Sequence, residues 1–197
     1  VGKLYFIKYN SLVVATTRPE TRLGDTALAV NPNDERYKHL IGAEISFEAS
    51  DPSIPALKAP RKQEIKLPVI GDDAVDSTFG SGVLKITPAH DSIDYDIYTR
   101  HSNIGFLEII DETAHMRPEA GKRYAGLTTK EARERVIEDL RELGLIEKIE
   151  EYTHSIGICE RCGSVIEPLL SDQWFLKMRA LSEAVIRVIK KNKIAFV

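Results

Sequence analysis

The chain has 197 residues, of which 43% are hydrophobic and 29% charged, and these values are ordinary for a globular protein with one large domain. The net charge of −3 excludes a protein that grips nucleic acid by bulk positive charge, so any contact with RNA has to rely on a local site. The sequence contains neither an apolar run long enough to cross a membrane nor a signal-peptide pattern, and its two cysteines cannot build a disulfide framework. We therefore expect a cytoplasmic protein with no membrane contact.

The first half of the chain is predicted to consist mostly of strands. Residues 3–9 are predicted to form a strand whose side chains alternate between its two faces, and residues 12–17 form a β-branched run bounded by turn residues. Residues 51–68 contain four prolines and are predicted to form loops with short edge strands, because proline cannot donate a hydrogen bond to a sheet. A further strand is expected over residues 83–87, and Pro88 ends it.

The second half of the chain favours helices. Residues 128–131 form a capping box, and the apolar stripe that follows ends at Gly144, where a C-terminal cap belongs. The stripe consists of Ala132, Val136, Leu140 and Leu143. Helices are also expected from about Asp91 to His101 and over residues 176–191. Strands followed by helices indicate an α+β fold, for which we predict a twisted or closed, barrel-like sheet core with peripheral helices.

The stretch from Phe79 to Tyr95 carries the clearest chemical pattern. Two glycines flank Ser81, which lets the backbone approach a ligand closely. On the strand that follows, Lys85 and Thr87 lie on one face while apolar side chains lie on the other. A strand with one polar and one apolar face is a suitable wall for a binding pocket.

Two carboxylates follow this strand. Asp91 and Asp94 are three residues apart, which places them on one side of a helix. Beside a lysine and a threonine they could bind a small cationic ligand, because an α-ammonium group needs a carboxylate partner. On spacing alone, an alternative remains open in which these carboxylates only stabilise the start of the helix against its dipole. His90 is likewise of a type that is more often structural than catalytic.

A second stretch, residues 14–27, places hydroxyl groups and an arginine at the end of a strand. Thr16, Thr17 and Arg18 are able to hold a phosphate, a ribose or a terminal adenosine. Threonines at strand ends are also common caps, so this stretch by itself leaves both functions open.

Together, the two stretches resemble the editing domain shared by valyl-, isoleucyl- and leucyl-tRNA synthetases. Thr-Thr-Arg-Pro-Glu-Thr at residues 16–21, followed by Gly-Asp-Thr at residues 24–26, resembles the threonine-rich motif of that family. Residues 79–95 resemble its glycine motif and the aspartate-bearing segment after it, and the likeness extends over nearly the whole chain. Within the family, Lys-Ile-Thr-Pro-Ala-His-Asp at residues 85–91 is similar to the valyl branch, with the leucyl and isoleucyl branches as alternatives.

The resemblance implies a role for each residue of the two motifs. The catalytic positions that it implies are Asp91, Asp94, Lys85 and Thr87. In this assignment Asp91 holds the α-ammonium group of the substrate, and Asp94 meets the hydroxyl group of threonine. The implied substrate-binding positions are Thr16, Thr17, Arg18, Phe79, Gly80, Ser81, Gly82 and His90. Ser81 departs from the family, which usually has threonine there, so that the hydroxyl group is kept and a methyl group is lost.

The implied activity is post-transfer editing. The 3′ end of a tRNA(Val) that carries threonine enters the pocket, and water attacks the ester that joins the two. Threonine is nearly isosteric with valine, and valyl-tRNA synthetase is the usual example of a hydrophobic pocket that cannot strongly reject such a competitor. A second pocket that requires a hydroxyl group passes threonine and excludes valine. A non-catalytic tRNA-binding module remains an alternative of a different class.

The end of the chain differs in character from the rest. By the same resemblance, we expect the body of the editing domain at residues 1–152. At residues 153–197 we expect a segment with a cysteine pair and a helix that leads back to the Rossmann catalytic domain of the synthetase. Cys159 and Cys162 form half of a zinc knuckle, whereas a closed structural site needs four ligands. We therefore expect a partial zinc site here and no cofactor in the editing site.

Overall fold

The computed structural model describes residues 2–47, 65–191 and 193, whose strands form two sheets. The first sheet has the strand order β2-β1-β7, and the second has the order β4-β5-β3-β6. The strands are β1 (Gly2–Tyr9), β2 (Leu12–Thr16), β3 (Ala27–Val30), β4 (Glu44–Phe47), β5 (Ile65–Gly71), β6 (Val83–Ile86) and β7 (Ile146–Tyr152). The α-helices are α1 (Ser92–Arg100), α2 (Thr129–Glu142) and α3 (Met178–Lys190).

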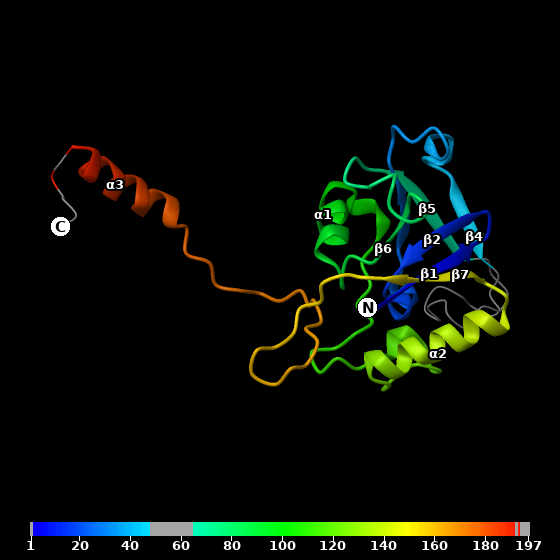
Figure 1. Ribbon diagram of the computed structural model, residues 1–197. Coiled ribbons are helices and arrows are strands. Elements are labelled where there is room, and N and C mark those ends of the chain that lie inside the picture. The colour runs from blue at the N-terminus through cyan, green and yellow to red at the C-terminus, as the bar shows by residue number, and fades with distance from the viewer. Residues whose placement is uncertain (1, 48–64, 192, 194–197) are drawn as a thin grey trace.

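The three-stranded sheet is covered by α2, which lies along it in Figure 1. β1 pairs antiparallel with β2 through a tight turn and with β7 on its other side. The predicted capping box of α2 is confirmed, since Thr128 and Glu131 each bond the other's backbone N–H. The stripe is confirmed at Ala132, Val136 and Leu140, which are fully buried, but not at Leu143, which is 43% exposed because it lies at the last turn, beyond the sheet.

The four-stranded sheet differs from the expectation for residues 65–68. Residues 65–68 were expected at a sheet edge or in a loop, yet they belong to β5, which has β4 on one side and β3 on the other. Pro68 is tolerated there because the pairing with β3 begins only at Val69, so Pro68 lies opposite β4 alone. The proline-rich stretch 51–64 lies outside the described residues.

The α+β class is confirmed, but a closed barrel is not. The described strands make two open sheets, in which β2 ends one sheet and β6 ends the other. These two end strands lie next to each other without belonging to a common ladder. A barrel needs a continuous ring of paired strands, and the described pairings stop at this junction.

Apolar side chains hold each sheet to its helix. One large cluster extends from the three-stranded sheet into α2 and the inner face of β3 and β5. A smaller cluster includes Ile86 of β6 and Ile97 of α1, both fully buried, and fixes α1 against the second sheet. α1 begins and ends as the sequence predicts, with Asp91 as its N-cap and His101 as its C-cap.

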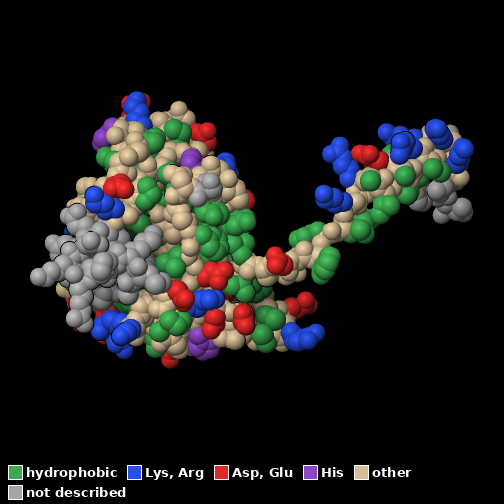
Figure 2. Space-filling model, turned by 180° about the vertical axis from the view of Figure 1, so that it is seen from behind, with side chains coloured by type: hydrophobic (Ala, Val, Ile, Leu, Met, Phe, Trp, Pro, Cys, Tyr) green, Lys and Arg blue, Asp and Glu red, His purple; other side chains and the backbone are tan. Residues whose placement is uncertain are grey.

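The chain beyond β7 leaves this body. Residues 153–191, called the tail below, run as an extended segment that ends in α3, and Figure 1 shows this helix well away from both sheets. The helix expected over residues 176–191 is confirmed as α3. Figure 2 shows hydrophobic side chains exposed along the tail and lysines and arginines gathered near its end. Within the described ranges, no helix is both long and apolar enough to cross a membrane.

Candidate active site

A cavity of about 320 Å³ opens where β2 and β6 meet. Its walls come from the end of β2, from the loop before β6, from β6 and from the start of α1. Of the residues predicted for the site, the cavity is lined by Thr16, Thr17, Arg18, Phe79, Gly82, Lys85, Thr87, His90, Asp91 and Asp94. The two threonine- and glycine-containing motifs, distant in sequence, thus lie on one cavity. Gly80 and Ser81 do not line it.

Lys85 and Thr87 form the innermost polar pair. As predicted, they lie on one side of the strand, and Lys85 Nζ donates to Thr87 Oγ1 over 2.6 Å. Both side chains are buried. A buried ammonium group requires a counter-charge, and Asp25 Oδ1 supplies one at 3.4 Å from Lys85 Nζ. The lysine is therefore a cation at the base of the cavity.

Asp94 is a buried carboxylate beside this pair. Its Oδ2 accepts the backbone N–H of Thr87 over 2.8 Å, and the residue is only 4% exposed. Burial raises the pKa of Asp94 to about 7, while the positive charge of Lys85 acts in the opposite direction. No described residue donates a hydrogen bond to Oδ1, so this oxygen is available to a ligand in the cavity.

Asp91 has a different environment from Asp94. Its Oδ1 accepts the backbone N–H groups of Ile93 and Asp94, so that Asp91 is the N-cap of α1 rather than a residue of its first turn. Asp91 therefore does cap the helix, and its contact with the substrate stays a prediction, whereas Asp94 bonds outside the helix. Asp91 is exposed and lines the cavity, which leaves Oδ2 free to meet a ligand.

His90 is held as a neutral structural histidine. Its Nε2 accepts the backbone N–H groups of Ile109 at 2.9 Å and Ile110 at 3.3 Å, which places the proton on Nδ1. Burial, reinforced by Arg18 and Lys85, lowers the pKa of His90 to about 4. A histidine with this tautomer and pKa is a poor general base at neutral pH.

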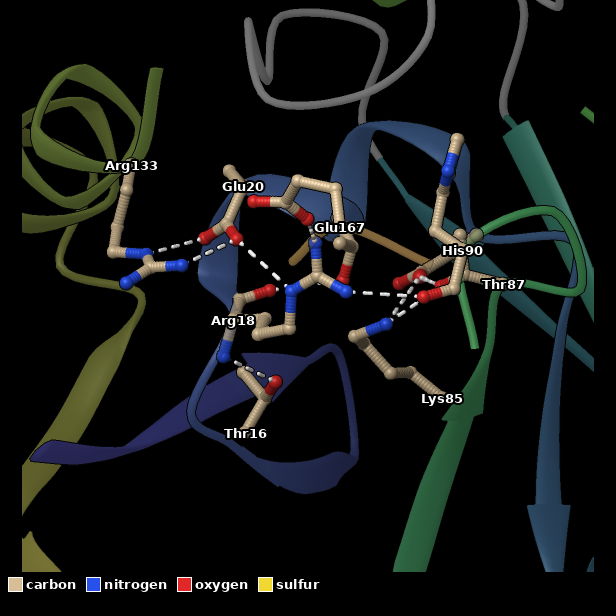
Figure 3. A network of polar contacts seen from close by, with 10 residues as sticks. Thr16, Arg18, Glu20, Lys85, Thr87, His90, Arg133 and Glu167 are labelled. Atoms are coloured by element: carbon tan, nitrogen blue, oxygen red, sulfur yellow. Dashed lines mark hydrogen bonds and ion pairs between the residues drawn. The ribbon is translucent and has the colours of Figure 1, made fainter. Parts of the chain in front are cut away.

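Arg18 lies at the entrance of the cavity within a network that Figure 3 shows from close by. Its Nη1 donates to the carbonyl oxygen of His90 over 3.0 Å, and its Nε lies 3.3 Å from Glu20 Oε1. Glu20 is fully buried and also takes two 2.7 Å bonds from Arg133 of α2. Glu167 of the tail forms an ion pair with Arg18 Nη2. Arg18 is thus oriented from three sides.

The threonines before Arg18 differ in their engagement. Thr16 Oγ1 accepts the backbone N–H of Arg18 over 3.0 Å, which fixes the turn after β2. Thr17 lines the cavity from the next position. A short 3₁₀-helix, η1 (Pro19–Gly24), follows and is entirely buried.

The loop before β6 brings its backbone close to β2. Gly80 has a φ of 57°, and any side chain there would collide with Ala15. Gly82 has a φ of 83°, and a side chain there would collide with Arg36. Ser81 Oγ accepts the backbone N–H of Val83 over 3.2 Å, so this hydroxyl shapes the loop instead of facing the cavity. The two glycines allow the approach, while Ser81 holds the turn.

Phe79 forms an aromatic edge of the cavity. It is 40% exposed, and its ring packs edge-to-face on Tyr152 of β7 at 5.8 Å between centroids. An exposed aromatic ring beside a cationic entrance is suited to a nucleobase.

Comparison with known proteins finds relatives by sequence but no protein-family model that matches the chain. The chain is 52% identical over 201 residues to a valine–tRNA ligase of Petrotoga mobilis, a match that covers 99% of this chain and 21% of that protein. It is 48% identical over 202 residues to a valine–tRNA ligase of Carboxydothermus hydrogenoformans, covering 100% of this chain and 21% of that protein. By sequence, the whole chain is similar to one region of valine–tRNA ligases.

The chain spans about a fifth of the length of these curated valine–tRNA ligases. The match selects the valyl branch from the three that the sequence motifs left open. A solved structure described as the crystal structure of GlLeuRS-CP1 has a TM-score of 0.49 and 15% identity, over 71% of this chain and 83% of that chain. A likeness at this level decides neither fold nor function.

Three residues near the site were not assigned a role by sequence reasoning. Thr21 lines the cavity from η1. Asp25 bonds Thr87 and pairs with Lys85, and Tyr9 of β1 donates to Asp25 over 2.6 Å. Thr21 and Asp25 lie within the threonine-rich motif, so the motif could have identified them as residues of the site. Tyr9 carried no such signal, because it is one aromatic residue in an ordinary strand.

The cysteine pair lies in the tail, on a tight turn. The backbone N–H of Gly163 donates to the carbonyl of Cys159, and a short bridge between Ile158 and Val165 closes the loop. The hydroxyl group of Ser164 lowers the pKa of Cys162 to about 7. Among the described residues, no group of three or more histidine, cysteine or acidic side chains could hold a metal ion. Within the described chain the two thiols therefore have no third metal ligand beside them.

Proposed function

We propose that this chain is the editing domain of a valine–tRNA ligase and that it hydrolyses threonyl-tRNA(Val) after transfer. The observation that carries the proposal is the buried carboxylate of Asp94, which lies beside the Lys85 cation and leaves one oxygen to the cavity. Burial of a carboxylate without a full set of hydrogen bonds is costly, and a ligand that donates one removes the cost.

The two aspartates divide the recognition of threonine between them. Asp91, exposed at the start of α1, offers an oxygen to the α-ammonium group of the amino acid. Asp94, deeper in the cavity, accepts the side-chain hydroxyl group. Valine has a methyl group in that place and would leave the buried carboxylate unpaired, so the pocket favours threonine by a missing hydrogen bond.

The reaction is the hydrolysis of an ester. The oxygen of a water molecule bonds to the carbonyl carbon of threonine, the bond from that carbon to the ribose oxygen breaks, and the ribose oxygen takes up a proton. Free threonine and an uncharged tRNA result. Because the tautomer and low pKa of His90 disqualify it as a base, we assign the main contribution to the positioning of water and ester by polar side chains and by the neighbouring ribose hydroxyl.

The 3′ end of the tRNA is the proposed partner of the cavity entrance. Arg18 is a fixed cation there, Thr16 and Thr17 carry hydroxyl groups, and Phe79 offers an aromatic surface to the terminal adenine. With a net charge of −3, the chain relies on the remainder of the ligase, with its Rossmann catalytic domain, for most of its hold on tRNA. We place this work in the cytoplasm, together with the rest of translation.

A non-catalytic tRNA-binding module is the competing function. Such a module would need Asp91 as a helix cap but would gain nothing from a buried carboxylate and ammonium group at the base of a cavity, where each costs desolvation energy. The arrangement around Asp94 therefore favours the catalytic function.

The test is single-turnover deacylation with the chain in excess over radiolabelled threonyl-tRNA(Val) or valyl-tRNA(Val). An excess of chain offsets weak tRNA binding. We expect the threonyl ester to be lost faster than the valyl ester, by a factor of about 100 or more. Loss of both esters at the rate of the uncatalysed reaction, at saturating chain, would show that the cavity only binds.

We also propose that Cys159 and Cys162 supply half of a zinc site whose remaining ligands lie elsewhere. No step of the proposed hydrolysis uses this metal. The chain alone should bind zinc weakly, and Cys159→Ser should remove that binding without changing deacylation. Tight binding of one zinc ion by the unaltered chain would contradict this proposal.

A further inference from the structure

A continuous line of buried side chains lies directly behind the cavity. Tyr9 of β1 donates its hydroxyl to Asp25 Oδ2 over 2.6 Å, and Asp25 Oδ1 accepts the hydroxyl of Thr87 over 2.8 Å. Thr87 in turn accepts from Lys85 over 2.6 Å. All four residues are buried, yet only Thr87 and Lys85 line the cavity. Tyr9 and Asp25 thus touch the site from the inside of the protein.

The donors and acceptors in this line have one consistent assignment. Asp25 as a carboxylate can only accept, so the single hydroxyl proton of Thr87 points to Asp25. Thr87 Oγ1 must then accept from Lys85, because an ammonium group can only donate. Asp25 therefore sets the direction of the Thr87 hydroxyl. Without it, that proton would be free to turn toward the cavity.

The charge of Lys85 also indicates a role for Asp25. Lys85 is 7% exposed, and Asp25 lies 3.4 Å from its ammonium nitrogen. One ammonium proton is directed to Thr87 and one toward Asp25, which leaves the third for the cavity. On the far side, the Arg22 guanidinium lies over the Tyr9 ring at 4.1 Å and helps to fix the ring that holds Asp25.

We propose that Asp25 and Tyr9 are positioning residues of the hydrolytic site: they hold the Thr87 hydroxyl proton away from the cavity, so that Thr87 accepts from Lys85, and they hold the Lys85 ammonium group with one proton directed toward the bound ester. This inference rests on the proposed function. Neither residue meets the substrate, so both act on the rate of the chemical step rather than on binding.

A second buried tyrosine–aspartate pair, Tyr124 and Asp139, serves as a control for Tyr9 and Asp25. Tyr124 is fully buried and donates to Asp139 Oδ2 over 2.6 Å, the same bond length as between Tyr9 and Asp25. Asp139 belongs to α2 and pairs with Arg123, and none of Tyr124, Asp139 and Arg123 lines the cavity. Tyr9→Phe and Tyr124→Phe therefore remove the same kind of buried bond, one behind the site and one away from it.

The experiment compares these variants and Asp25→Asn in single-turnover deacylation of threonyl-tRNA(Val), with the chain concentration varied. We expect Tyr9→Phe to lower the maximal rate about 10-fold and Asp25→Asn about 100-fold, with half-saturating concentrations within about twofold of the unaltered chain. Tyr124→Phe should leave both quantities within about twofold. Urea unfolding should show similar losses of stability for the two Phe variants, which separates positioning from folding.

A second measurement needs no tRNA. In NMR of nitrogen-labelled lysine, the Lys85 ammonium protons should exchange slowly with solvent in the unaltered chain and in Tyr124→Phe, and faster in Tyr9→Phe and Asp25→Asn. Equal maximal rates for Tyr9→Phe and Tyr124→Phe in an active chain would overturn the positioning role alone. An unaltered chain that clears no ester would overturn the proposed function, and unchanged Lys85 exchange in both site variants would then overturn the positioning role as well.

Discussion

The cavity and the tail depart from the usual distribution of side chains in opposite directions. Around the cavity, charged groups are buried: Glu20 is 0% exposed, Asp25 3% and Lys85 7%. Along the tail, apolar groups are exposed, with Trp174 at 103% and Phe175 at 86%. Apolar residues of α3, including Leu181 and Val185, are also half-exposed. Both patterns cost free energy unless a partner compensates.

The compensation differs between the two regions. The buried charges of Asp25 and Glu20 have partners within the described chain, Lys85 and Arg133, whereas Asp94 keeps one oxygen for a ligand. None of the residues described in α3 is buried, and Figure 1 shows the helix well away from both sheets. The charges near the cavity are therefore stabilised mainly by other residues of the body, whereas the tail adds little to the stability of the body.

The largest expected effect comes from Asp91→Ala, which removes the proposed ammonium partner. Hydrolysis of threonyl-tRNA(Val) should fall at least about 1,000-fold, equivalent to about 4 kcal/mol of transition-state stabilisation. The helix cap of α1 is lost as well, at about 1 kcal/mol in urea unfolding. Thr128→Ala is the matched control, because it removes the cap of α2 at a similar cost and should leave hydrolysis unchanged. If hydrolysis falls equally in both variants, Asp91 has only a structural role.

Asp94→Asn should stabilise the protein while it inactivates the site. The pKa of Asp94 is about 7 in the folded state against an ordinary 3.8, so between these values the folded state binds the proton that the unfolded chain has lost. Wild-type stability therefore declines as the pH rises from about 4 to about 7, and an asparagine escapes that decline. Relative to pH 4, the variant should gain about 2–4 kcal/mol at pH 8 in urea unfolding. A gain independent of pH would contradict the burial of a titrating carboxylate.

Glu167→Gln tests the contact between tail and cavity. It removes the ion pair with Arg18, which is partly exposed, so the stability should change by less than about 1 kcal/mol. Glu20 and the His90 carbonyl still hold Arg18, and deacylation should therefore stay within about threefold. Glu183→Gln, which breaks an exposed pair within α3, is the control. A drop well beyond threefold for Glu167→Gln alone would mean that the tail organises the entrance of the cavity.

The smallest effect is expected in α3. Leu181→Ser should leave both the unfolding midpoint of the body, followed by far-UV circular dichroism, and the deacylation rate unchanged, because this side chain is 55% exposed on a helix without buried residues among those described. Fluorescence of Trp174, the single tryptophan, should report a solvent-exposed indole before and after the body unfolds. A lower midpoint in Leu181→Ser would show that α3 packs on the body after all.

Local patterns predicted much of this molecule. The capping box at Thr128 and Glu131 and the N-cap at Asp91 depend on residues within four positions of one another. The two motifs likewise placed Lys85 and Thr87 on one face, because side-chain direction alternates along any strand. The strand over residues 3–9 was predicted correctly, but the alternation of buried and exposed side chains within it was wrong, because residues 4–7 are all buried and both faces of β1 pack against apolar clusters. The exposure of Leu143 was missed, since the sequence does not say where the sheet beneath α2 ends.

By itself the sequence predicted several of the strands and helices, the resemblance to valyl-tRNA synthetases and most of the side chains at the site, but it did not predict roles for Thr21, Asp25 or Tyr9. Only the tertiary structure decided how those side chains are used. The bond from Thr87 to Asp25 spans 62 residues, that from Tyr9 to Asp25 spans 16, and the ion pair of Arg18 with Glu167 spans 149. The separation of the described strands into two open sheets and the pairing of Pro68 with β4 alone likewise depend on the tertiary structure. Such pairings depend on which surfaces pack together, and no local pattern encodes the partner across that distance.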